Sequence, residues 1–297
     1  MLPKIATLVT CLLATAARAA LPAMAPVTAS DSLLIVAPHP DDESLCCAGL
    51  IHEARKAGAK VAIVWITDGD AFHWDAMVVN HVLVPDRAAY RHLAQIRQGE
   101  ARDAARILDV APGSTYFLGY PDRGVGRLMA DYYAPPVPWR SHYTGARSAM
   151  YPGSFELGAR YDGESLTREF GDVLDRVQPT LVFAPSTQDM HPDHHGAALL
   201  VSRVLTTRGE LGMLRSWIVH GGPGWPHGGY EPRSPQTVAP TGSGLQWEVL
   251  DLDEDSVAAK LQAISAHRSQ LEVMEHVMRR YVRSTELFTT DPAPALR

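Results

Sequence analysis

The stretch 32–43, SLLIVAPHPDDE, joins a short, mostly apolar run to a loop that carries one histidine and three carboxylates. An unbroken apolar run of this length is typical of a strand buried on both faces of a parallel sheet. A helix is expected directly after the loop, from Leu45 to Ala57, and Gly58 ends it. Because such sheets bind ligands at the carboxyl ends of their strands, the polar loop lies where a functional site is expected.

Strand-like and helix-like patterns alternate through the rest of the chain. The further strands are expected at 60–66, 115–118, 180–184, 216–219 and 246–252, and the further helices at 87–108, 166–177, 196–207 and from 256 into the 280s. This order predicts an α/β fold, with a Rossmann-like, mostly parallel sheet and helices on both faces. Without a repeat or a convincing linker, residues 20–297 are expected to form a single domain, with a Tyr- and Pro-rich excursion at about 124–163.

Composition limits the classes of function. The chain has 297 residues, 46% of them hydrophobic and 20% charged, which is typical of a globular protein. Its 27 basic and 33 acidic residues give a net charge of -6, without any block of like charge. Nucleic-acid binding normally depends on clustered Lys and Arg, so no nucleic acid is expected as a partner.

The N-terminus has the pattern of a secretory signal peptide. Lys4 precedes the apolar run from Ile5 to Ala17, and Ala17-Arg18-Ala19 offers a small-x-small cleavage site. A membrane span is the competing interpretation, but the run of about 13 residues is shorter than the roughly 20 that cross a bilayer. We therefore expect residues 1–19 to be removed, leaving a secreted or periplasmic protein without a transmembrane segment in the mature chain.

The cysteines exclude some kinds of site. Three of them, at Cys11, Cys46 and Cys47, supply neither a disulfide framework nor a four-thiolate zinc site. Neighbours in sequence rarely bond to each other, so Cys46 and Cys47 are expected to be free, buried thiols. Any metal must then be held by histidines and carboxylates.

A second polar loop, DMHPDHH at 189–195, follows the strand expected to end at Ala184. If both strands lie near the centre of the sheet, the two loops face each other. His39, Asp42 and His194 then offer two nitrogens and one oxygen, a ligand set that suits catalytic zinc and leaves one position for water. Zinc lowers the pKa of bound water from 15.7 toward ~7, and Asp41 remains free as the general base.

The same residues have simpler explanations. His-Pro-Asp strings also occur in turns, where Asp caps a helix, so either loop alone could be a cap. Asp68 and Asp70, after the second strand, could line the same pocket or cap the next element. Strings typical of other enzymes are missing from the sequence: His-Glu-x-x-His, Gly-x-Ser-x-Gly, a phosphate loop and Gly-x-Gly-x-x-Gly.

Both loops resemble the signatures of one family. The run 37–43, APHPDDE, resembles the AHPDDE motif of the PIG-L/LmbE-like N-acetylglucosaminyl deacetylases, with Pro38 inserted before the histidine, and 191–194, HPDH, resembles their second motif. Further similarities lie at 67–70, 97–100, 118–122 and 260–270. The resemblance spans roughly residues 31 to 270 and implies a zinc-dependent amidase that deacetylates amino sugars.

The resemblance also implies a role for each matching residue. The metal ligands are His39, Asp42 and His194, and Asp41 is the base. His191 stabilises the oxyanion, and Asp193 orients and charges its imidazole. Arg97 and Asp122 occupy positions that hold sugar hydroxyls, although Arg97 could instead pair with Glu100 on its helix.

The expected function is an exported zinc amidase that removes the N-acetyl group from an amino sugar in a glycan or glycoconjugate. A non-catalytic glycan- or metal-binding protein on the same scaffold and a hydrolase of a different amide are the alternatives. The excursion is rich in aromatic residues, at Tyr132, Tyr133, Trp139, Tyr143, Tyr151 and Tyr161. Their rings could stack on sugars or simply pack against one another.

Overall fold

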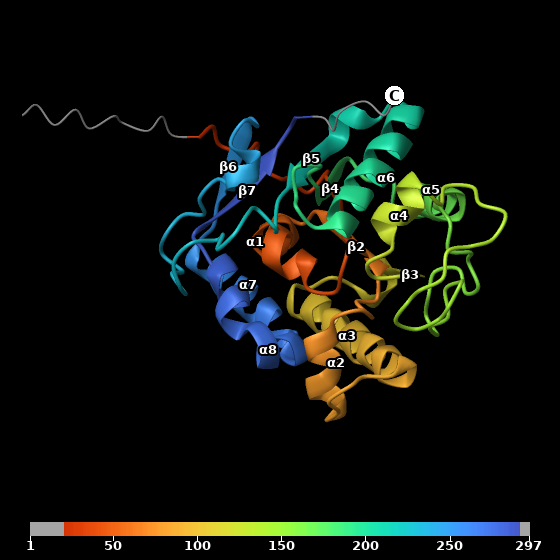
Figure 1. Ribbon diagram of the computed structural model, residues 1–297. Helices are drawn as coiled ribbons and strands as arrows, with labels where there is room; N and C mark the ends of the chain where they lie inside the picture. Colours follow the sequence, from red (N-terminus) through yellow and green to blue (C-terminus); the bar gives the residue numbers. More distant parts are fainter. Residues whose placement is uncertain (1–20, 292–297) are drawn as a thin grey trace, which may run out of the picture.

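The computed structural model describes residues 21–291, and the expected signal peptide at 1–19 lies outside them. Seven strands form one sheet in the order β3-β2-β1-β4-β5-β7-β6 (Figure 1). The strands are β1 (Ser32–Ala37), β2 (Lys60–Thr67), β3 (Thr115–Tyr120), β4 (Leu181–Pro185), β5 (Leu214–Trp217), β6 (Trp247–Asp251) and β7 (Thr285–Thr289). The first five strands are parallel, while β7 pairs antiparallel with both of its neighbours. The expected α/β fold with a mostly parallel sheet is confirmed.

Helices cover both faces of this sheet. They are α1 (Asp42–Lys56), α2 (His73–Asn80), α3 (Arg87–Ile107), α4 (Val125–Ala130), α5 (Gly163–Val177), α6 (Pro192–Arg208), α7 (Glu254–Ala266) and α8 (Arg268–Met278). Alternate residues of β1 enter opposite cores: Leu33 and Ile35 pack with α1, α3 and α7, and Leu34 and Val36 with α4, α5 and α6. Of the helices in residues 21–291, none has the length and apolar character needed to cross a bilayer.

The C-terminal region differs most from expectation. Instead of one helix from residue 256 into the 280s, two helices meet at His267, whose φ of -80° and ψ of 62° are not helical. The side chain of His267 is fully buried, and its Nε2 lies 2.9 Å from Oε1 of Glu43. The break between α7 and α8 is therefore stabilised by a residue far away in the sequence, and local periodicity does not show it. The strand β7 and the short helices α2 and α4 were not expected either.

The prediction of free thiols at Cys46 and Cys47 is wrong, because the two residues form a disulfide within α1. The expectation took only their adjacency in sequence into account. At the same level of α1, the backbone N–H groups of Gly49 and Leu50 donate to the Glu286 carboxylate, at 2.9 and 2.8 Å. Glu286 of β7 thus contacts α1 within one turn after the cysteines.

A buried ion pair anchors α1 to the C-terminal part of the fold. Nζ of Lys260 lies 2.6 Å from Oε1 of Glu286 and also donates to the Leu45 carbonyl at 2.8 Å. Both charged side chains are 2% exposed. Burial of one charge without the other is costly, so the pair is needed even where its net contribution to stability is small.

The substitution Lys260→Met is expected to lower the free energy of unfolding by about 3–5 kcal/mol, because it leaves Glu286 buried without its partner. Urea unfolding followed by circular dichroism measures this loss. The control Lys56→Met removes an exposed ion pair with Asp253 and is expected to leave stability nearly unchanged. A Lys260→Met protein as stable as the control would contradict the assignment.

Candidate metal and catalytic site

The two polar loops meet at the centre of the sheet. Strand β1 lies between β2 and β4 and pairs parallel with both, so the loops that follow β1 and β4 leave the sheet at the same edge. They lead into α1 and α6, which begin at Asp42 and Pro192. This is the point where the strand order changes direction, the usual ligand position in open α/β sheets.

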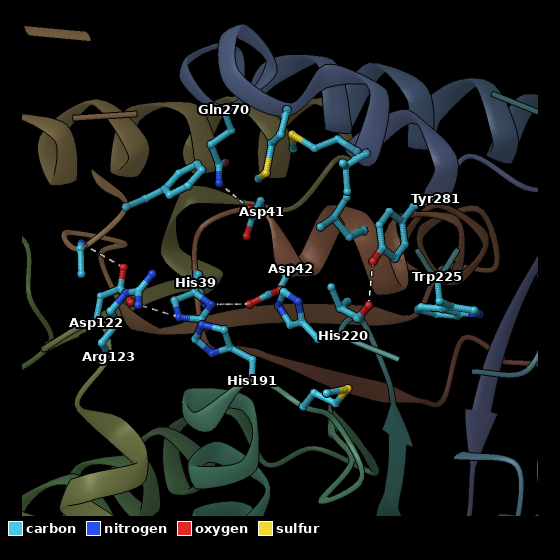
Figure 2. Close-up of a pocket in the computed structure, with 18 of the residues that line it drawn as sticks. His39, Asp41, Asp42, Asp122, Arg123, His191, His220, Trp225, Gln270 and Tyr281 are labelled. Carbon is cyan, nitrogen blue, oxygen red and sulfur yellow. Dashed lines mark hydrogen bonds and ion pairs between the residues drawn. The ribbon is translucent and has the colours of Figure 1, made fainter. Parts of the chain in front are cut away.

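Asp42 lies between the two histidines that are predicted as its fellow metal ligands. Its Oδ2 lies 3.2 Å from Nδ1 of His39 (Figure 2) and 3.2 Å from Nε2 of His194. The three residues are at most 7% exposed. The structure thus brings together the three residues that the sequence predicts as metal ligands.

His194 is oriented by a residue whose role sequence analysis missed. Oδ2 of Asp189 lies 3.1 Å from Nδ1 of His194 and accepts the backbone N–H groups of Val219 and His220, at 2.8 and 2.9 Å. Burial alone lowers the pKa of His194, but the Asp189 and Asp42 carboxylates outweigh it and raise that pKa to about 10. A carboxylate behind a histidine is a common support for a metal ligand.

The cluster also includes residues beyond the predicted three. Potential ligand atoms lie within 4.8 Å of one another in three overlapping groups: His39, His191 and His194; Asp42, His194 and His220; and His39, Asp122 and Asp193. His220 follows β5, and its spacing in the sequence gave no reason to select it. Only its place beside β4 in the sheet brings it to His194.

Asp41 lies beside the ligands in an unusual backbone conformation. Its φ of 149° is one that residues with a side chain rarely adopt, and such strain costs on the order of 1–3 kcal/mol. Although Asp41 precedes α1, its side chain makes no capping hydrogen bond, so the simple capping explanation does not apply to it. Its Oδ2 accepts a hydrogen bond from Nε2 of Gln270 and lies 3.6 Å from the Arg97 guanidinium.

Burial and the adjacent Asp42 carboxylate raise the pKa of Asp41 to about 6, against the opposing effect of the Arg97 charge. A carboxylate with a pKa near neutrality is suited to accept and return a proton. Sequence analysis missed Gln270 as a partner of Asp41, although it forms part of the segment 260–270 that resembles the family.

His191 and Asp193 are placed differently from what the resemblance implies. Nδ1 of His191 caps α6 by accepting the backbone N–H of Asp193 at 3.2 Å. The Asp193 carboxylate instead lies 3.3 Å from Nε2 of His39 and accepts the backbone N–H groups of Arg123 and Val125, at 2.5 and 2.9 Å. Burial lowers the pKa of His191, and the surrounding imidazoles lower it further.

Close packing of α4 on α6 explains the position of Asp193. A Cβ atom at Gly196 would lie 2.6 Å from the backbone nitrogen of Gly126, so the two helices approach each other only because glycine is present. The N-terminal end of α4 then presents its N–H groups to the Asp193 carboxylate. Such an anionic partner at a helix N-terminus is favourable.

Arg97 and Asp122 both line the site, but their polar groups already have protein partners. The Arg97 guanidinium donates to the carbonyls of Gly69 and Pro40, both at 2.9 Å, and does not pair with Glu100, which accepts from Ser269. Asp122 accepts from the backbone of Ala71 at 3.0 Å, and its Oδ1 lies 3.4 Å from Nε2 of His39. Arg97 thus holds the loop that carries Asp41, and a sugar contact remains a prediction for both residues.

Asp68 and Asp70 are buried behind the site. Nε2 of Gln98 donates to Asp68 at 2.7 Å, and the Tyr151 hydroxyl donates to Asp70 at 2.8 Å. Burial raises the pKa of Asp68 to about 7 and that of Asp70 to about 8. Neither residue lines the cavity at the site.

The aromatic residues of the excursion pack within the protein. Trp139, Tyr151 and Tyr161 are buried, and the Tyr161 hydroxyl donates to the Gly119 carbonyl at 3.0 Å. None of the six rings lines the cavity. Of the two explanations offered for these rings, the structure supports packing.

A cavity of about 540 Å³ opens onto the cluster. It is bounded by Asp41, the predicted ligands His39 and Asp42, His191 and the exposed side chain of Arg123, which sequence analysis did not single out. This volume lies within the roughly 300–1,000 Å³ of small-molecule sites. The fold and site together define an α/β protein with a His- and Asp-rich centre next to a ligand-sized cavity.

Comparison with known proteins gives the family. Residues 34–205 match the family model described as PIG-L, GlcNAc-PI de-N-acetylase, so the chain belongs to this family. It is 30% identical over 200 residues to 1D-myo-inositol 2-acetamido-2-deoxy-alpha-D-glucopyranoside deacetylase of Nocardia farcinica, and the match covers 65% of the chain and 56% of that relative. The chain thus matches about half the length of the first relatives.

Solved structures share the fold at lower identity. N,N'-diacetylchitobiose deacetylase from Pyrococcus horikoshii superposes with a TM-score of 0.53 and 21% identity, over 89% of this chain and 86% of that one. A 4-carboxy-2-hydroxymuconate hydratase from Pseudomonas putida superposes with a TM-score of 0.51 and 20% identity, over 84% and 82%. Because a hydratase has the same fold, the fold alone does not decide the activity.

Proposed function

We propose that the protein is an exported, zinc-dependent deacetylase that hydrolyses the N-acetyl group of an amino sugar in a glycan or glycoconjugate. The observation that carries this proposal is the position of Asp41. Its carboxylate is buried next to the predicted ligands but makes no hydrogen bond or ion pair with them. Membership in the PIG-L family and the similarity to the Nocardia farcinica deacetylase support the choice of an N-acetylated amino sugar.

The residues present fit a zinc ion. Both ring nitrogens of His194 are buried and lack a hydrogen-bond partner of acceptable geometry, although Asp42 and Asp189 lie close. A site of two imidazoles and one carboxylate is typical of catalytic zinc. His39, Asp42 and His194 would hold the ion, which would supply Lewis acidity and lower the pKa of water.

Asp41 takes the proton of the attacking water in this proposal. Gln270 and Arg97 fix its carboxylate so that one oxygen stays directed toward the cavity, where the scissile carbonyl is expected (Figure 2). In this proposal His191, which lines the cavity, donates a hydrogen bond to the oxyanion. A donor of this kind contributes on the order of 2.7–4 kcal/mol. Asp193 acts as a positioning residue through His39.

A non-catalytic binding protein is the second candidate, and a hydrolase of another amide is the third. Binding alone does not require a strained carboxylate beside the ligands, so the backbone of Asp41 favours an enzyme. The first and third candidates differ only in the amide that is hydrolysed, and analysis of the products distinguishes them.

The proposed function predicts that the purified protein releases acetate from N-acetylglucosamine or its oligomers and that a chelator stops the release. Acetate and free amine are to be measured in parallel, because equal amounts of both identify amide hydrolysis. Binding of the sugar without acetate release would contradict the enzyme and support the second candidate. Release of a different acid from other amides would support the third.

Export is tested with the full chain expressed in a bacterium. We expect the mass of the mature protein to correspond to a chain that starts at residue 20. An intact N-terminus on protein recovered from the cytoplasm would contradict this expectation.

A further inference from the structure

The cavity at the site has two walls of different chemistry. On one side lie Asp122 and Arg123, with the ring of His39 (Figure 2). Ala71, which donates to Asp122, and the neighbouring Phe72 line the cavity as well. On the other side lie Tyr281 and Trp225 (Figure 2). Met274, Val277 and Met278 of α8, the helix that leads to Tyr281, also line the cavity. The reacting groups stand between the two walls.

Helix α8 begins at the general base and continues as an apolar surface. Gln270 donates to Asp41, and Met274, Val277 and Met278 of α8 line the same cavity, together with Tyr281 of the turn after the helix. The backbone of Met274, with φ of -141° and ψ of 33°, is not helical, so these side chains form one surface by lining the same cavity and not by sharing an unbroken helix face. The apolar surface thus starts where an acyl carbonyl would be attacked and leads away from it.

This wall is built before any ligand arrives. Met278 has no exposed surface and belongs to the hydrophobic core beneath this wall, and Tyr281 is 7% exposed. The Tyr281 hydroxyl donates to the Val219 carbonyl at 2.7 Å, and its ring packs edge-to-face against Trp225 at 5.9 Å. These contacts turn the polar hydroxyl of Tyr281 to the backbone of Val219, so its ring can face an apolar group.

The polarity of the walls sets the direction of an amide substrate. Sugar hydroxyls against the methionine wall would lose hydrogen bonds to water without gaining others, which is unfavourable. The sugar is therefore better placed at Asp122 and Arg123, and the acyl group at α8. An acetyl methyl group would leave most of the apolar wall uncovered.

We propose that this wall binds an N-acyl group longer than acetyl, so that the substrate class is amino sugars that carry an aliphatic N-acyl chain. This inference rests on the proposed amide hydrolysis. The water oxygen forms the new bond to the carbonyl carbon, the C–N bond breaks, and the nitrogen takes a proton. The products are the free fatty acid and the amine.

The test uses N-acylglucosamines with acyl groups from acetyl to octanoyl, and free amine is measured. Each buried methylene group stabilises by about 0.8 kcal/mol, which corresponds to about fourfold in kcat/KM. We expect kcat/KM to rise at least tenfold from acetyl to hexanoyl. A constant or falling value, with acetyl hydrolysed, overturns the inference and leaves the proposed function intact. No hydrolysis of any member overturns both.

A second series tests the direction of the substrate. In this series the acyl group stays acetyl and the alkyl glycoside of N-acetylglucosamine is lengthened from methyl to octyl. We expect kcat/KM to change less than threefold, because the glycoside lies toward the polar wall. A rise with glycoside length and none with acyl length would place the apolar group on the sugar and overturn the inference.

A variant locates the effect on α8. Met274→Trp fills the wall close to Asp41, and we expect it to lower the ratio of hexanoyl to acetyl kcat/KM at least tenfold. The ratio is taken within one preparation, so a loss of folded protein does not change it. The control Leu157→Trp alters an exposed residue that does not line the cavity and is expected to keep the wild-type ratio. If the wild-type protein prefers hexanoyl and Met274→Trp has the same ratio, the role of this wall is overturned.

Discussion

Replacing Asp41 by asparagine is expected to lower kcat by 10²–10⁴-fold and to leave the metal content unchanged. The amide is nearly isosteric with the carboxylate but cannot accept the proton of the attacking water. Asp41 makes its side-chain contacts to Gln270 and Arg97 and not to the predicted ligands, so its replacement leaves His39, Asp42 and His194 in place.

The control for this substitution is Asp68→Asn, which changes another buried carboxylate near the site that does not line the cavity. It is expected to keep most of the turnover. Metal content by mass spectrometry and kcat are measured on the same preparations. Near wild-type turnover in Asp41→Asn would require another base, and Asp70 would be the next candidate, although its Oδ2 is engaged by Tyr151.

The centre of the fold could be predicted because its signal is local. In β1 all six residues are buried, which is why an unbroken apolar run marked it with its observed bounds. The loops after β1 and β4 were recognised for the same reason, since each follows such a run directly. Their meeting depends only on parallel pairing of the two strands, which the alternation of strands and helices implies.

The supporting residues could not be predicted because their signal is not local. Gln270 is 229 positions from Asp41, and Val219 and His220 reach Asp189 from a neighbouring strand. No spacing rule connects such positions. The disulfide between Cys46 and Cys47 was missed for a different reason, because adjacency in sequence argued against it.

The same limit affects Asp193. The resemblance implied a pairing with His191, two residues away, but the Asp193 carboxylate is held by Arg123 and Val125. These partners come from the start of α4, a helix within a segment that showed little periodicity. A carboxylate surrounded by several possible donors takes those that the packing of helices brings closest, and this packing depends on Gly126 and Gly196.

Removing one predicted metal ligand is expected to have the largest effect. The wild-type protein should hold about one zinc ion per chain, and His39→Ala, Asp42→Ala or His194→Ala should each empty the site. Turnover should then fall by more than in Asp41→Asn, because these variants lose the Lewis acid and the activated water together. Zinc is measured by mass spectrometry after dialysis, and folding by circular dichroism.

Neighbouring histidines provide the matched controls for His194. His195 is exposed, and its Nδ1 lies 3.0 Å from the Thr187 carbonyl, so His195→Ala should keep both zinc and activity. His220 lies within ligand distance of Asp42 and His194 but is exposed, and His220→Ala should retain zinc if three ligands suffice. Full zinc content in His194→Ala would refute the ligand assignment. Loss of zinc in both His194→Ala and His220→Ala would instead make His220 a fourth ligand, and no protein-free position for water would remain in a tetrahedral site.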